Sequence, residues 1–168
     1  MRAPDSEMVA LLEKIVYSRS TGVPPFRCHK GHWPGPPCLQ PAELFREGSF
    51  YSLHHPPHEW EAVGVSGSMA SFLANNVFVS PEGFANLSPV SMENDLKIVQ
   101  KELTRGVSPF WCHKGHRPGP ACGGPVTVQR EYYGSALFHV PPAAKPHDWE
   151  AVYVSEDMAN FLRNYLQL

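Results

Sequence analysis

The sequence contains the same cysteine- and histidine-bearing loop twice. CHKGHWPGPPC runs from Cys28 to Cys38 (loop 1) and CHKGHRPGPAC runs from Cys112 to Cys122 (loop 2), and together they hold all 4 cysteines of the 168 residues. Neither loop can form a helix, because its prolines lack the backbone N–H that a helix interior requires. The fold must therefore accommodate two stiff, non-helical loops that are rich in thiols and imidazoles.

The loops belong to a longer internal repeat. At an offset of 84 positions the segment 22–38 matches 106–122, and HEWEAV from His58 matches HDWEAV from His147. Similarity over most of each half indicates two copies of one structural unit. The predicted organisation is repeat 1 at 1–79, a linker at 80–90 and repeat 2 at 91–168.

Each unit is predicted to fold as a helix, a metal-binding loop, a short antiparallel sheet and a second helix. Apolar residues recur at helical spacing in the two opening helices: Met8, Leu12, Ile15 and Val16, and Met92, Leu96, Val99 and Leu103. The predicted N-caps of the opening helices are Ser6 and Ser91, and Gly22 and Gly106 are predicted to end these helices. The closing helices are predicted to start at Ser66 and Ser155. The predicted class is α+β, a tandem duplication packed as a pseudo-two-fold pair.

The histidines favour a metal site in each unit. Of the 9 histidines, all except His55 occupy matching positions in the two halves. Thiolates and imidazoles together complete the tetrahedral shell of a structural Zn²⁺. We predict two zinc ions per chain, one bound by Cys28, His32, Cys38 and His58 and the other by Cys112, His116, Cys122 and His147. The other paired histidines are alternative ligands or hydrogen-bond partners of the ligands: His29, His54, His113 and His139.

Other interpretations of the cysteines remain open at this point. Each loop could close a disulfide, or its thiols could stay unligated. A hydrolase would use a cysteine nucleophile or a zinc ion with an open position, with Glu61 or Glu150 as the general base. The second cysteine in each loop favours metal binding over nucleophilic attack, so an enzyme is the less favoured interpretation.

Charge and composition narrow the class of partner. The formal net charge is −2, and no cluster of Lys or Arg stands out, so a DNA partner is not expected. Each loop nevertheless has a basic and aromatic tip that could contact RNA or protein, formed by Lys30 and Trp33 or by Trp111 and Lys114.

The sequence pattern predicts neither a membrane-spanning helix nor a secretory signal. No apolar stretch approaches the roughly 20 residues of a membrane-spanning helix, and the start MRAPDSEM lacks the apolar segment of a secretory signal. We expect a soluble intracellular protein in a reducing compartment, that is the cytoplasm, the nucleus or an organelle matrix.

The function that these features favour is a non-catalytic, zinc-stabilised scaffold or binding protein. It would be a small subunit that docks on a larger protein or ribonucleoprotein assembly. The alternatives are a zinc- or thiol-dependent hydrolase and an RNA-binding module that uses the loop tips.

Overall fold

The computed structural model describes residues 6–28, 40–47, 50–54, 63–112, 126–130, 136–139 and 152–166. Within these residues the chain forms five helices and two four-stranded antiparallel sheets, which confirms the predicted α+β class. The helices are α1 (Ser6–Ser20), α2 (Gly67–Asn76), α3 (Pro81–Ala85), α4 (Pro89–Thr104) and α5 (Glu156–Leu166). The strands are β1 (Phe26–Cys28), β2 (Glu43–Glu47), β3 (Phe50–His54), β4 (Val63–Val65), β5 (Phe110–Cys112), β6 (Thr127–Arg130), β7 (Ala136–His139) and β8 (Val152–Val154).

The two sheets each combine strands from both halves of the chain. Sheet A has the order β1-β8-β7-β6, and sheet B has the order β2-β3-β4-β5. β1, from the first half, is therefore the edge strand of a sheet whose other strands come from the second half, and β5 has the reverse arrangement. Each half contributes one edge strand to the other half's sheet, and we call β1 and β5 the exchanged edge strands.

Backbone hydrogen bonds also connect the two sheets at these edge strands. The Cys28 amide donates to the Gln40 carbonyl at 2.8 Å, and the Ala42 amide donates to the Phe26 carbonyl at 3.0 Å. In the second half, the Val126 amide donates to the Phe110 carbonyl at 3.4 Å. β1 and β5 thus contact one sheet on one side and the segment leading into the other sheet on their other side.

Most of the predicted helix boundaries are confirmed. The Ser66 and Ser155 hydroxyls accept hydrogen bonds from the amides three residues ahead, at 3.2 and 3.3 Å, as N-caps do. Gly22 and Gly106 follow the ends of α1 and α4 with φ angles of 103° and 91°. Only glycine adopts this left-handed conformation without steric cost, and it is the common way to end a helix.

The prediction of Ser91 as an N-cap was wrong. The cap of α4 is Ser88, whose hydroxyl accepts from the Ser91 amide at 3.4 Å. Pro89 occupies the first turn, where its fixed φ angle suits a helix and its missing N–H costs nothing. The helix therefore begins earlier, and the segment predicted as a linker contains α3, whose Phe84 is buried.

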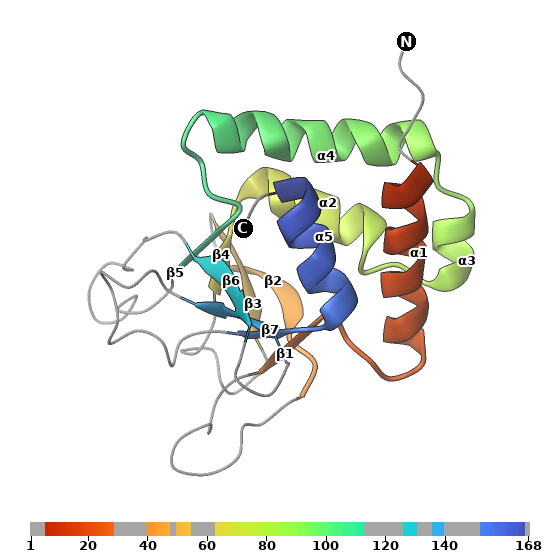
Figure 1. Cartoon of the computed structure of the whole chain (residues 1–168), viewed down its shortest axis with the longest axis horizontal. Helices are drawn as coiled ribbons and strands as arrows, with labels where there is room; N and C mark the ends of the chain where they lie inside the picture. The colour runs from red at the N-terminus through yellow and green to blue at the C-terminus, as the bar shows by residue number, and fades with distance from the viewer. Residues whose placement is uncertain are drawn as a thin grey trace.

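A single hydrophobic core joins residues from both halves. Figure 1 shows the five helices on one side of the molecule and the strands on the other. α2 packs on β2 and β3 of sheet B, and α5 packs on β6 and β7 of sheet A. The predicted core positions of α1 are buried, as are those of α4 except Leu103, which is half-buried.

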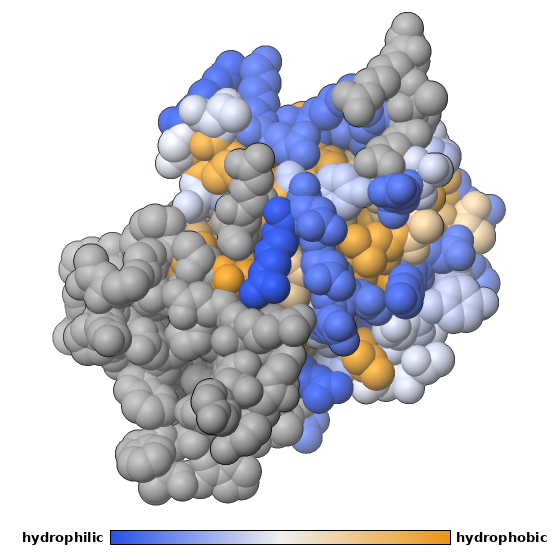
Figure 2. All heavy atoms as spheres, in the orientation of Figure 1, coloured by the Kyte–Doolittle hydropathy of each residue, from blue (hydrophilic) through white to orange (hydrophobic). Residues whose placement is uncertain are grey.

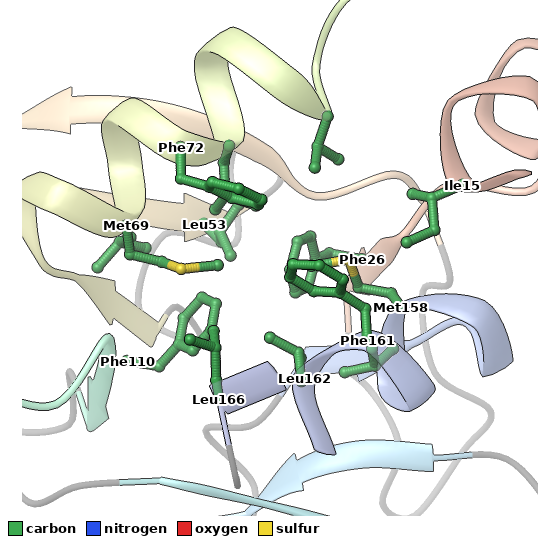
Figure 3. Close-up of a cluster of buried hydrophobic side chains, with 14 of the residues drawn as sticks. Ile15, Phe26, Leu53, Met69, Phe72, Phe110, Met158, Phe161, Leu162 and Leu166 are labelled. Carbon is green, nitrogen blue, oxygen red and sulfur yellow. The ribbon is translucent and has the colours of Figure 1, made fainter. Parts of the chain in front are cut away.

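Phe26, on β1 of sheet A, and Phe110, on β5 of sheet B, belong to this core. Both side chains are 0% exposed, and their ring centroids are 5.9 Å apart (Figure 3). Each is the first residue of an exchanged edge strand, opposite Val154 and Val65 respectively. The contact therefore connects the two strands that cross between the halves.

Candidate metal centre

Cys28 is the predicted ligand whose side chain the structure describes, and it ends β1. Phe26 and Cys28 are buried, whereas Arg27 between them is partly exposed, as the period-2 alternation of a strand requires. The Cys28 side chain is 3% exposed. Its sulfur therefore lies at the border between the apolar core and the start of loop 1.

Cys112 has the same position in the other sheet. It is the last residue of β5 and lies opposite Val63, the first residue of β4. Cys28 likewise lies opposite Val152, the first residue of β8. Both loops thus begin where an exchanged edge strand ends.

His54 and His139 end strands in matching positions. His54 closes β3 opposite Glu43, and His139 closes β7 opposite Thr127. In an antiparallel sheet, strands separated by one neighbour run in the same direction. β1 and β7 are separated by β8, so Cys28 and His139 lie at the same end of sheet A.

Cys112 and His54 follow the same rule in sheet B, because β3 and β5 are separated by β4. The antiparallel bridge between Arg27 and Pro41 aligns the two sheets, because it sets the segment that enters β2 antiparallel to β1. The backbone positions of all four residues therefore lie at one end of the strands.

The remaining predicted site residues lie outside the described part of the chain. Six predicted ligands are in this group, together with two alternative histidines and three loop-tip residues: His32, Cys38, His58, His116, Cys122, His147, His29, His113, Lys30, Trp33 and Lys114. Within the described ranges, no group of three or more His, Cys, Asp or Glu side chains lies close enough to hold a metal ion. The zinc sites remain predictions.

Trp111 differs from its predicted place at a loop tip. It lies inside β5, opposite Gly64 of β4, and is half-buried. A Cβ atom on Gly64 would lie 2.5 Å from Trp111 Cδ2 and closer still to Cε2 and Cζ2. The indole therefore occupies the space that a side chain at position 64 would need.

The sequence contained a signal for this contact. The match between the halves sets VGV at 63–65 against VYV at 152–154. A glycine inside a strand often marks the close approach of another group. The contact makes Trp111 a structural residue of β5.

The face of the molecule drawn in Figure 2 mixes polar and apolar residues where the residues are described. Figure 2 shows hydrophilic and apolar atoms interspersed on the face it draws, without a large region of one kind. No helix among the described residues has the length and apolar character needed to cross a membrane.

No protein-family profile matches the chain, and neither a curated protein nor a solved structure is significantly similar to it.

Proposed function

We propose that this protein is a duplicated, zinc-stabilised scaffold without catalytic activity. The observation that carries the proposal is the equivalent placement of Cys28 and Cys112. Each ends an edge strand, opposite the first residue of a strand from the other half. Two copies of one unit related by a pseudo-two-fold axis would place their cysteines in this way.

Zinc is the ion that suits these residues. Each loop supplies two thiolates and two imidazoles, and further histidines end β3 and β7 at the same end of the strands. A ligand shell filled by Cys and His is typical of structural zinc and leaves no position for a reacting water. The proposed ligands are Cys28, His32, Cys38 and His58 in one half and Cys112, His116, Cys122 and His147 in the other.

The ions would stabilise loops 1 and 2, which the burial of apolar side chains stabilises little. Loops of Pro, Gly, His and Lys bury little hydrocarbon, so they gain little from the hydrophobic effect. Metal binding compensates for the conformational entropy lost when such loops become ordered. A rigid end of the molecule would then be available for binding a larger protein or ribonucleoprotein assembly.

The scaffold should lose its partner when either zinc site is broken. We expect Cys28→Ser and Cys112→Ser each to reduce co-purification of the assembly at least tenfold from cells that express the tagged full-length chain. The reason is that an unligated loop relaxes and deforms the binding surface. Quantitative mass spectrometry of the recovered proteins measures the effect.

Lys114→Ala is the matched control, because it changes the charge of loop 2 and keeps every proposed ligand. It should leave recovery of the assembly unchanged. Full recovery with both cysteine variants would contradict the scaffold, and so would hydrolysis of a test ester or peptide by the purified chain.

A further inference from the structure

The exchanged edge strands bear on which histidine serves which loop. Cys28 lies opposite Val152, and Cys112 lies opposite Val63. In the sequence, His147 precedes Val152 by five positions, and His58 precedes Val63 by the same five. Cys28 is therefore paired with β8, the strand that follows His147 of the second half. Cys112 is paired with β4, the strand that follows His58 of the first half.

The directions of β1 and β8 also favour a site shared by Cys28 and His147. Because β1 and β8 are antiparallel, the chain enters Val152 from the same end of sheet A at which it leaves Cys28. Opposite residues in such a pair have Cα atoms roughly 5 Å apart, and five residues span at most about 17 Å. The chain length therefore permits His147 to reach an ion bound at loop 1.

His58, the histidine in the same half as Cys28, leads into a strand that does not lie beside β1. His58 leads into β4, which lies in sheet B between β3 and β5 and is not a neighbour of β1. The strand beside β4 that ends in a cysteine is β5. Sequence proximity pairs loop 1 with His58, whereas the sheet order pairs it with His147.

We infer that the two zinc sites are shared between the halves: Cys28 and His147 bind one ion, and Cys112 and His58 bind the other. This inference rests on the proposed zinc function and changes its ligand sets. Each ion then fastens an exchanged edge strand to the neighbouring strand from the other half. Each metal would connect the two halves across a strand pair, β1–β8 or β4–β5, that backbone hydrogen bonds also connect.

Zinc counts in double variants of the full-length chain test this sharing. Native mass spectrometry with a mild chelator present counts the ions bound per chain. Cys28→Ser and His147→Ala should each lower the count from two to one. Their combination should still retain one ion, because both changes affect the same site, whereas Cys112→Ser with His147→Ala should retain none.

Ligand sets confined to one half predict the reverse for the two double variants, and that result would overturn the inference while leaving the zinc function intact. Loss of both ions from both double variants would also overturn it, because the sites would then not be independent. A wild-type chain without zinc would refute the proposed function itself. His55→Ala is the control, since His55 has no counterpart in the other half, and it should retain both ions.

Discussion

Replacing Phe26 or Phe110 by alanine is expected to lower the free energy of unfolding by about 3–5 kcal/mol, the cost of deleting a fully buried phenylalanine. Both rings are 0% exposed and contact one another at 5.9 Å. Each belongs to an exchanged strand, so the cavity weakens the packing of both sheets. Since a small protein has only about 5–15 kcal/mol of stability, chemical denaturation would measure this loss readily.

The ring contact adds a second expectation. The double variant should cost less than the sum of the two single variants, with a coupling of about 0.5–1.5 kcal/mol. Val23→Ala and Val107→Ala are matched controls, because these residues precede β1 and β5 and are 43% and 45% exposed. They should change stability by about 0.5 kcal/mol or less. Equal losses in the controls and in the phenylalanine variants would contradict the shared core.

Gly64→Ala is expected to destabilise the protein by about 1–3 kcal/mol, the range for overpacking a closely packed site. The added methyl group would overlap the Trp111 ring, so the indole must leave its position on β4. Its emission should shift to longer wavelength as the ring becomes exposed. Thermal or chemical denaturation followed by tryptophan fluorescence measures both effects.

Two further variants isolate the cause. Gly67→Ala adds the same methyl group at the start of α2, where nothing lies within 4 Å, and should be neutral or slightly stabilising. In a Trp111→Ala background, Gly64→Ala should lose its cost. An undiminished cost in that background would mean that the indole is not what excludes a side chain at position 64.

Local features of the fold could be predicted from the sequence because they depend on neighbours in the chain. The spacing of Met8, Leu12 and Ile15 predicts the buried face of α1, and the serine hydroxyl at 66 caps α2 through an amide three residues away. The start of α4 was misplaced because Ser88 and Ser91 are both good caps. Pro89 favours the earlier start.

The strand exchange could not be predicted, because it depends on pairings between distant residues. β1 and β8 have three residues each, and Cys28 pairs with Val152, far along the chain. Hydrophobic pattern gives the face of a strand but not its partner. The matching halves predict two packed units, each with a sheet of its own, and this pattern groups the ligands within each half.

The contact between Gly64 and Trp111 was missed for the same reason. Trp111 stands beside loop 2 in the sequence, which suggested an exposed tip, whereas its partner Gly64 lies on β4 from the first half. Cross-strand partners of this kind become visible only when the register is known.

The zinc content of the wild-type chain tests the central claim most directly. The full-length protein would be purified without added metal or chelator, and its intact mass measured by native mass spectrometry before and after denaturation in acid. The account predicts two zinc ions per folded chain, released on denaturation to leave four reduced thiols. A folded chain without metal, whether its cysteines are free or joined in disulfides, would contradict it.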